Sequence, residues 1–277
     1  MAKVISSYNT IFDNFSFHHS VSDIKNAPAE YHHETHSQFE ILYLVDGEIK
    51  YKIEGEEYLV KKGDVIFVSP NEIHSLKIVG GDKYERIVVM FDLDNLTQIL
   101  SVGNLSLDRE IFSNVKGYRV IPKELLNLTD IKKIMSEIAL AKDEKLLPLY
   151  VLTKIFSLIL ELSKIFEKTD GGSYPLRTDK TVQSAIEYIE QNIHTPLSLE
   201  QIASALFVSK STLCHKFVKA TGVSVNNYVN IKKIYHSAKL IKQGMGVLEA
   251  SLAVGYTQYT TFYHNYKKIL GVSPSGK

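Results

Sequence analysis

The last eighty or so residues contain one sequence unit written twice, and this duplication constrains the fold more than any other feature. Ile202 of the first copy corresponds to Ala250 of the second at an offset of 48. Further pairs correspond at an offset of 49: Leu213/Phe262, Phe217/Tyr266, Lys219/Lys268 and Gly222/Gly271. Two copies are too few for a solenoid, which needs about three or more stacked repeats. The pattern therefore predicts two small units side by side.

Each copy has the sequence pattern of a helix-turn-helix. Ser198 and Gln201 form a capping box before a short helix. The longer second helix has an apolar stripe of Leu213, Phe217 and Ala220. Gly222 and Gly271 are placed to end the two longer helices as left-handed caps. The pattern predicts a second helix whose outer face is free to enter a groove, with a helix over residues 225–243 joining the copies.

Charge is distributed unevenly along the chain. Residues 178–277 contain eleven Lys, no Arg and five acidic residues, a net charge of +6, whereas residues 1–177 carry −5. This asymmetry is typical of a domain that neutralises phosphates, fused to one that does not.

The second copy is similar to a known family. Val254-Gly255-Tyr256, Phe262, Gly271 and Ser273-Pro274 resemble the DNA-binding domain of the AraC/XylS family of bacterial transcription regulators, and the resemblance covers about residues 180–275. The chain departs from the family pattern at four places: Phe207 replaces the Gly of the first turn, Ala250-Ser251 replaces Ile-Ala, and His215 and His264 replace the recognition-helix Arg.

The resemblance implies double-stranded DNA as a partner. The expected DNA-binding residues are Lys210, Ser211, Thr212, Cys214, His215, Lys216, Lys219, Gln258, Tyr259, Thr260, Tyr263, His264 and Lys267. Without Arg, the commonest guanine reader is missing, so sequence readout would depend on the other polar side chains and on DNA shape. Any one of these residues could contact phosphate instead.

The front half has a different pattern. Short β-type runs at residues 39–45, 50–53, 58–60, 65–68, 75–79 and 87–91 predict an antiparallel sandwich or barrel, after an irregular segment at residues 1–30. The segment Tyr31 to Ile41, the turn Gly63-Asp64, Pro70 and His74 resemble the cupin-type sensor domain found in many AraC-family proteins.

We therefore expect an α+β multidomain protein. An effector-binding and dimerisation domain would span residues 1–168, with an antiparallel β cupin-like barrel at about 31–95 and helices at about 123–168. A linker at 169–178 would precede an all-α DNA-binding domain at 179–277 with two helix-turn-helix units.

Residues 125–145 and 146–168 of the front domain are predicted to form two helices, and the second has more than one interpretation. Its apolar residues Val151, Ile155, Leu158, Leu162 and Ile165 follow the 4-3-4-3 spacing of a coiled-coil seam. They could pack on the barrel, form a dimer seam, or divide these roles between two sides.

Three residues are candidates for binding in the barrel. His36, Glu40 and His74 fit positions that hold a metal in cupins, while Glu34 stands at a further His position. Such ligands suit iron, manganese or zinc, but the AraC-family resemblance implies effector binding instead. We expect these residues to line an effector site with no metal or other cofactor, and purely structural roles stay open.

Cysteine usage and hydropathy bear on location. A single cysteine, Cys214, excludes an intramolecular disulfide and fits a reducing cytosol. It is either a small packing residue or a redox-sensing thiol. Residues 146–166 are the most apolar segment, but Lys154, Glu161 and Lys164 interrupt it. We expect a cytoplasmic protein with no signal peptide and no membrane span.

The leading hypothesis is a transcription regulator, not an enzyme. Its cupin-like domain would sense a small molecule, a sugar or related metabolite, and change how a homodimer engages DNA; contact with RNA polymerase is left open. The alternative is a metal-dependent cupin enzyme with a helical appendage. A third hypothesis gives the front domain only a dimerising role.

Overall fold

The computed structural model describes residues 3–9, 15–26, 31, 33–104, 119–126, 129–140, 146–168 and 175–275. The chain forms two compact units, which meet in the sequence at Leu176 and Arg177. The end of the predicted helix at 125–145 and most of the predicted linker lie outside the described residues.

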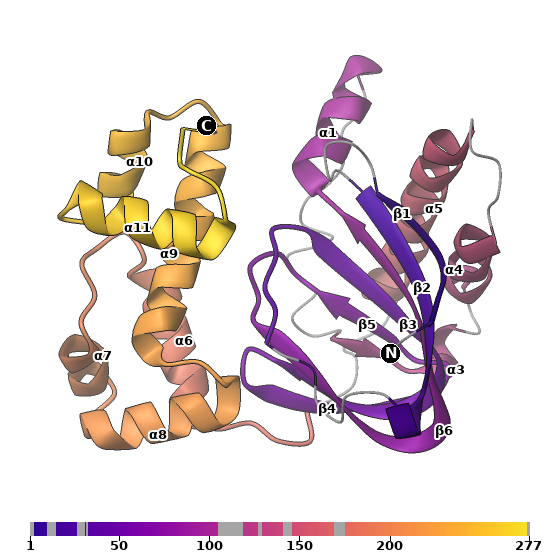
Figure 1. Cartoon of the computed structure of the whole chain (residues 1–277), viewed down its shortest axis with the longest axis horizontal. Helices are drawn as coiled ribbons and strands as arrows, with labels where there is room; N and C mark the ends of the chain where they lie inside the picture. The colour runs from indigo at the N-terminus through magenta and orange to yellow at the C-terminus, as the bar shows by residue number, and fades with distance from the viewer. Residues whose placement is uncertain are drawn as a thin grey trace. The chain divides into compact units, whose positions relative to one another are not determined.

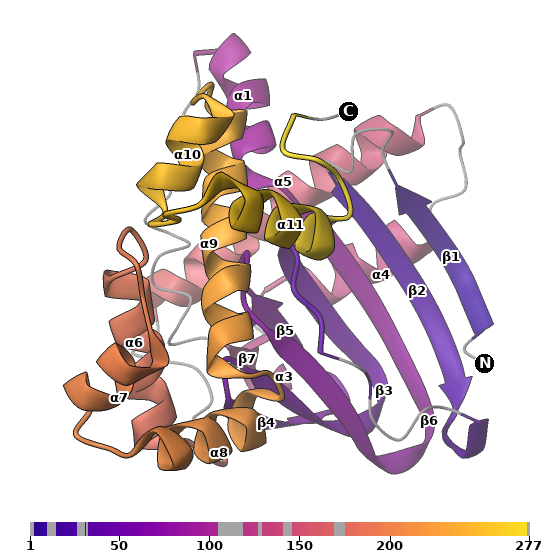
Figure 2. The same ribbon diagram turned by 60° about the vertical axis from the view of Figure 1, so that its left-hand side comes forward.

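The N-terminal unit is built on one sheet. Its strands are β1 (Lys3–Asn9), β2 (Phe15–Asp23), β3 (Phe39–Ile53), β4 (Glu56–Lys61), β5 (Val65–Val68), β6 (His74–Phe91) and β7 (Val120–Ile121). They pair in the order β1-β2-β6-β3-β5-β7 with antiparallel neighbours, and β4 pairs with β3 (Figure 2). The antiparallel sheet expected from the sequence is confirmed, but the prediction of an irregular N-terminal segment is wrong, because β1 and β2 extend the sheet beyond β6.

Two pairs of predicted short strands are single long strands. Residues 39–45 and 50–53 both belong to β3, and residues 75–79 and 87–91 both belong to β6. The chain passes through glycine without turning back: Gly47 has a φ of +105°, and a Cβ there would lie 2.7 Å from the Lys83 carbonyl oxygen. The strand register shifts between Leu44 and Ile49. Because a bulge changes which residues share a face, even-numbered and odd-numbered residues of β3 come to point the same way.

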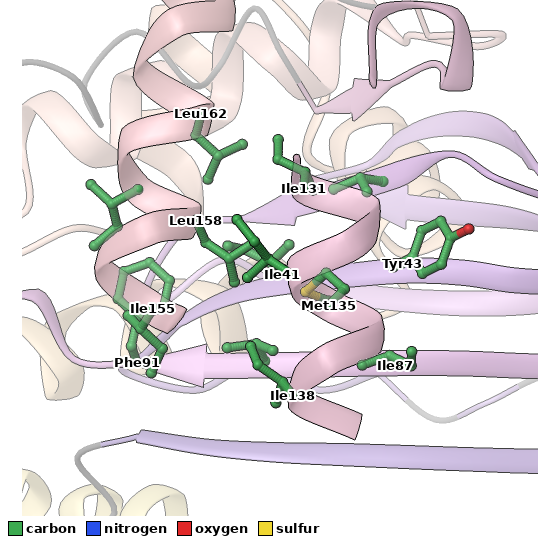
Figure 3. Packing of buried hydrophobic residues seen from close by; sticks show 14 of the residues in the cluster. Ile41, Tyr43, Ile87, Phe91, Ile131, Met135, Ile138, Ile155, Leu158 and Leu162 are labelled. Carbon is green, nitrogen blue, oxygen red and sulfur yellow. The ribbon is translucent and has the colours of Figure 1, made fainter. Parts of the chain in front are cut away.

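Both faces of this sheet are covered. Alternate residues of β3 and β6 such as Ile41, Tyr43, Ile87 and Phe91 pack against α4 (Ile131–Leu140) and α5 (Leu147–Lys168) (Figures 1 and 3). The residues between them, such as Leu42 and Val88, belong to a second cluster on the other face. Fully burying a large apolar side chain contributes about 1.5–3 kcal/mol, so the two clusters supply most of the driving force for this unit.

The predicted dimer seam on α5 is wrong as a partner surface. Its five residues, Val151, Ile155, Leu158, Leu162 and Ile165, are between 0% and 4% exposed and lie in the cluster on the sheet. Their spacing matches a coiled coil because a helix resting on a sheet also presents one narrow apolar stripe.

The other helices of this unit are short. In the described part of the predicted helix at 125–145, the structure has the end of α3 (Lys123–Leu126) and then α4, and α1 (Leu93–Val102) was not predicted. Asp92 caps α1 by accepting hydrogen bonds from the backbone of Asp94 and Asn95. A short 3-10 helix, Ile24–Asn26, follows β2. Among the described residues, no helix has the length and apolarity needed to cross a membrane.

The C-terminal unit is all helical, as predicted. It contains α6 (Lys180–Gln191), α7 (Leu199–Ala205), α8 (Lys210–Thr221), α9 (Val225–Lys242), α10 (Val247–Ala253) and α11 (Tyr259–Leu270). The capping box of Ser198 and Gln201 is present, and Gly222 and Gly271 are left-handed caps with φ of 78° and 74°. These three predictions are confirmed. Helix α9 runs from the first helix-turn-helix, α7 and α8, to the second, α10 and α11 (Figure 1).

The two halves of this unit touch beside the middle of α9. The Lys233 ammonium donates to the carbonyl oxygens of Thr195, at 2.6 Å, and Gly255, at 3.3 Å. A ring nitrogen of His194, Nδ1, lies 3.1 Å from the Ala253 carbonyl oxygen. Gly255 approaches Thr195 so closely that a Cβ at Gly255 would lie 2.4 Å from the Thr195 carbonyl carbon. These contacts fix the second helix-turn-helix against the segment that precedes the first.

Candidate functional sites

The N-terminal unit contains a cavity of about 210 Å³ between β3, β6 and the segment that precedes β3. It is lined by His18, Tyr31, Glu34, His36, Glu40, Tyr51, His74, Ser75, Leu76, Arg86, Val88 and Met90. Drug-sized ligands usually occupy sites of roughly 300–1,000 Å³, so this cavity suits a smaller molecule.

The three residues singled out in the sequence meet in this cavity. His36 Nε2 lies 3.1 Å from Glu40 Oε2, and His74 Nε2 lies 3.8 Å from the same oxygen. The His36 and His74 rings meet edge to face with their centroids 4.9 Å apart. Glu40 is the second residue of β3 and His74 is the first residue of β6, and these strands pair with each other.

Both imidazoles are oriented by backbone carbonyls. His36 Nδ1 lies 2.9 Å from the Gln38 oxygen and His74 Nδ1 lies 3.0 Å from the Glu72 oxygen. A carbonyl oxygen only accepts, so each Nδ1 carries the proton and donates. The Nε2 atoms of both rings are therefore the ones directed at Glu40.

The cavity stabilises a charged Glu40. Burial would raise the pKa of this carboxyl group, but the hydrogen bond from His36 and the charges of His74, His36 and Arg86 outweigh burial and lower the pKa to about 2. Burial likewise would lower the pKa of His36, but its hydrogen bond to Glu40 and the carboxylate charge outweigh it and raise the pKa. The carboxylate is ionised at neutral pH.

Sequence reasoning missed further polar residues of the cavity, among them Tyr51 and Arg86. The Tyr51 hydroxyl donates to Glu40 Oε1 at 3.1 Å, and the Arg86 guanidinium lies over the Tyr31 ring, 5.3 Å from its centroid. Tyr51 reaches Glu40 because the bulge in β3 puts both on one face. Treating β3 as two strands hid that relation, whereas Arg86, a charge just before an apolar run, was a usable signal.

Neighbouring residues support the position of His74. Backbone hydrogen bonds join Glu34 and His74 in both directions, at 2.8 and 3.0 Å. Glu72, whose carbonyl oxygen holds the imidazole, forms a buried ion pair with Arg119 and accepts from the Ser69 backbone at 2.8 Å. The turn before β6 is therefore fixed by charge as well as by the sheet.

In the C-terminal unit, most of the residues expected to bind DNA are exposed. Ten are exposed: Lys210, Ser211, Thr212, His215, Lys219, Gln258, Tyr259, Thr260, His264 and Lys267. Three are partly buried: Cys214, Lys216 and Tyr263. His215 on α8 and His264 on α11, which correspond in the repeat, are both exposed, whereas Leu213 and Phe262, two residues earlier in each helix, are buried.

Two of the lysines have partners within this unit. Lys210 Nζ lies 2.6 Å from Glu200 Oε1, and Lys216 Nζ contacts Asp179 at 3.3 Å and the Thr181 hydroxyl at 3.0 Å. An exposed ion pair contributes little to stability, so Lys210 can exchange its carboxylate for another anion. Lys216 bridges α8 to the start of α6, which indicates a structural role.

Comparisons with known proteins agree with this geometry. A helix-turn-helix domain model matches residues 202–276, and an AraC-like ligand binding domain model matches residues 25–143. The uncharacterised HTH-type transcriptional regulator YbfI of Bacillus subtilis strain 168 is 25% identical over 230 residues, 80% of this chain and 78% of that protein. The uncharacterised HTH-type transcriptional regulator YdiP of Escherichia coli K12 is 22% identical over 251 residues, 88% of this chain and 79% of that protein.

Among solved structures, an apo form of a ToxT variant from Vibrio cholerae strain SCE256 is 15% identical, with a TM-score of 0.39, covering 94% of this chain and 95% of that one. The two family models account for both halves of the chain in the order expected from the sequence. The chain therefore belongs to the AraC family of transcription regulators, with a ligand-binding domain ahead of a DNA-binding domain.

Proposed function

We propose that this regulator binds one small polar molecule in the cavity around His36, Glu40 and His74, and that occupancy changes how α8 and α11 engage a promoter. The observation that carries the proposal is the convergence of these three side chains, with Tyr51 and Arg86, on one cavity of the ligand-binding domain. A ligand can alter DNA binding only by its different affinity for two arrangements of the protein.

The cavity chemistry favours a hydroxylated effector such as a sugar or a related metabolite. Its polar wall combines donors and acceptors, while Leu76, Val88 and Met90 provide an apolar part beside the Tyr31 ring. A sugar presents hydroxyl groups at its rim and carbon atoms on its faces, which matches a mixed lining of this kind.

A thermal-shift screen of metabolites against the full chain tests the effector proposal. Occupancy at about 100 times the dissociation constant raises the free energy of unfolding by about 2.7 kcal/mol. Glu40→Gln should remove the shift produced by a confirmed effector. Glu85→Gln is the matched control, because Glu85 also pairs with a histidine, His19, at 2.8 Å but does not line the cavity. An effector response that survives Glu40→Gln and His74→Ala would put the binding site elsewhere.

For DNA, we propose that α8 and α11 enter successive major-groove segments on one face of the duplex. Helix α9 has 18 residues, a length of about 27 Å at 1.5 Å per residue. Groove segments one turn apart are separated by roughly 34 Å. The contacts of Lys233 and Gly255 hold the two helix-turn-helix units at a fixed spacing, which supports simultaneous binding of α8 and α11 to one DNA duplex.

Base-specific roles for His215 and His264 can be tested separately from charge. Replacing either with Ala should weaken binding to the preferred site by about 1–3 kcal/mol and binding to random DNA hardly at all. The matched control is Lys219→Ala, which should weaken both kinds of DNA alike and reduce the slope of log affinity against log salt by about 0.9. Equal losses on all DNA for the histidine variants would assign them to phosphate contacts.

We further propose that the regulator acts in the cytoplasm as a homodimer. Leu149 and Leu160, 60% and 63% exposed, lie eleven residues apart on one side of α5, opposite the buried stripe. Exposed apolar residues grouped on a helix mark interaction surfaces. Leu160→Glu should shift sedimentation toward the monomer, whereas Ser157→Glu, a change at a more polar position of the same helix, should not.

A further inference from the structure

We propose that His36, Glu40 and His74 form a binding site for one divalent transition-metal ion of the zinc, iron or manganese type, in the wall of the effector cavity. The proposal shares its cavity with the proposed function but does not depend on it, because metal binding can be measured without effector or DNA. It also departs from the sequence-based expectation that these groups bind an effector without a metal.

The ligand atoms are close enough to share an ion. One atom from each of the three side chains lies within 4.8 Å of the other two, and the two distances to Glu40 Oε2 are 3.1 and 3.8 Å. Atoms held about 2.1 Å from one metal lie roughly 3.0–3.4 Å apart for angles of 90–110°. Closing the group around an ion therefore requires movements of about 1 Å or less.

The protonation states also suit a metal. Both Nδ1 atoms donate to backbone carbonyls, which leaves the Nε2 atoms to bind a metal; at His36 the ion would replace the Nε2 proton that is donated to Glu40. Metal-ligating histidines almost always donate their other ring N–H to a carboxylate, a carbonyl or water. Tyr51 supplies the equivalent support for the carboxylate, because its hydroxyl binds Oε1 and leaves Oε2 facing the two imidazoles.

The strongest observation is His74 itself. This side chain is 4% exposed, and within the described part of the chain its buried Nε2 has no hydrogen-bond partner, although it lies 3.8 Å from Glu40 Oε2. Leaving a buried polar atom unpaired destabilises a fold, because the atom loses its bond to water and gains none in return. A metal bound at Nε2 would give this atom the partner that it lacks among the described residues.

Without a metal, the same cluster would contain an ion pair between His36 and Glu40. A protonated His36 donates a hydrogen bond to Glu40 in that arrangement, but none of the residues that the structure describes gives His74 Nε2 a hydrogen-bond partner. Two imidazoles and one carboxylate are a donor set that binds zinc, iron and manganese. They occupy one side of an ion, so its remaining positions face the cavity, where an oxygen or nitrogen atom of an effector could coordinate.

Another histidine and glutamate pair provides the matched control. His19 Nε2 lies 2.8 Å from Glu85 Oε1 on the strand pair β2 and β6, and among the described residues this pair has no third ligand of the same kind nearby. His19→Ala and His74→Ala therefore each remove one histidine that contacts a glutamate, but only the second removes a proposed ligand.

The experiment measures binding of Zn²⁺ and Co²⁺ to tag-free full-length protein after chelator treatment, in a Cys214→Ser background that removes the single thiol. We expect one equivalent per chain by equilibrium dialysis with elemental analysis, and visible absorption bands of Co²⁺ in a coordinated site. Mg²⁺, which prefers oxygen ligands, should not compete. His74→Ala and Glu40→Gln should weaken Zn²⁺ binding at least tenfold, Tyr51→Phe should weaken it less, and His19→Ala should leave it unchanged.

Folding is checked by circular dichroism, and Glu40→Gln keeps the test valid if His74→Ala does not fold, because it preserves side-chain shape. The proposal is overturned if no stoichiometric binding occurs at about 100 µM Zn²⁺, which corresponds to a binding free energy of about −5.5 kcal/mol for a dissociation constant of that size, or if Glu40→Gln binds Zn²⁺ as the parent protein does. Either result identifies the cluster as an ion pair. It leaves the effector proposal standing, since the metabolite screen reads ligand binding independently.

Discussion

The two helix-turn-helix units share a sequence pattern but are stabilised differently. In the first, the serine hydroxyls of Ser198 and Ser209 cap α7 and α8, while in the second neither Gly246 nor Gln258 provides a side-chain cap. The turn differs in the opposite sense: Gly255 adopts a φ of 71° in the second unit, and Phe207 adopts a φ of 54° in the first. The first unit therefore has the better helix caps, and the second has the less strained turn. A shared family pattern does not determine the local stability of each unit.

The largest effect is expected from Gly255→Ala. The left-handed backbone disfavours a side chain by about 1–2 kcal/mol, and overpacking against the Thr195 carbonyl adds about 1–3 kcal/mol. Urea unfolding of the full chain, followed by circular dichroism, should show a loss of about 3 kcal/mol in the free energy of unfolding of the helical unit.

Gly271→Ala is the matched control for that variant. Gly271 has nearly the same φ, 74°, but nothing lies within 4 Å of a Cβ placed there. Its loss should be limited to about 1–2 kcal/mol, the backbone contribution alone. Equal losses for the two variants would remove the contact with Thr195 from this explanation.

The next effect concerns Lys233, which contacts both halves of the helical unit. Lys233→Met leaves the carbonyl oxygens of Thr195 and Gly255 without this donor, so we expect a loss of about 1–2 kcal/mol at pH 7. Thermal unfolding at fixed protein concentration measures the change. Lys239→Met is the control, because it replaces an exposed lysine of α9 and should have little effect.

The pH dependence of the same variant gives a second measurement. Burial lowers the pKa of Lys233 from 10.5 to about 8, so between these values the unfolded chain binds more protons than the native one. The free energy of unfolding contributed by this group therefore rises with pH from about 8 to about 10.5. The stability difference between wild type and Lys233→Met should grow over that window, and a constant difference would contradict the buried environment of the ammonium.

A smaller effect of opposite sign is expected at Phe207. Its side chain is 96% exposed, so Phe207→Gly loses little burial and relieves the left-handed strain. After the entropy of Gly in the unfolded chain is subtracted, we expect a gain of about 0.5–1 kcal/mol. Phe207→Ala should give no such gain, because Ala keeps the strain. Chemical unfolding of all three proteins tests the assignment.

The smallest effect is expected from Gly246→Ser in the second unit. The Gly246 backbone already has an N-cap conformation, with φ of −61° and ψ of 143°, so a hydroxyl there can accept a backbone N–H at the start of α10. The gain over Gly should be a few tenths of a kcal/mol, against a loss of about 1 kcal/mol for Ser198→Ala in the first unit. Melting temperatures measured in parallel compare the two caps directly.

The sequence predicted the helical unit better than the sheet unit, for a physical reason. Helix caps, turns and stripes are local, so Ser198, Gly222 and Gly271 could be assigned from their neighbours. The long strands β3 and β6 depend on pairing between distant segments, and their internal glycines have the same sequence signature as turns. The cavity was predicted in part: His36, Glu40 and His74 do lie together, whereas Tyr51 joins them only through a bulge that no local pattern announces.

The contacts around Lys233 also restrict how the chain length of α9 can vary. One inserted residue would advance this helix by about 1.5 Å and turn everything beyond it by about 100°. Gly255 and Ala253 would then swing away from Thr195 and His194, and His264 would face a different direction from His215. Insertions or deletions within α9 should therefore disturb both the packing of the helical unit and the orientation of α8 and α11, the longer helices of the two helix-turn-helix units. The length of this helix sets the angular phase between the two recognition helices.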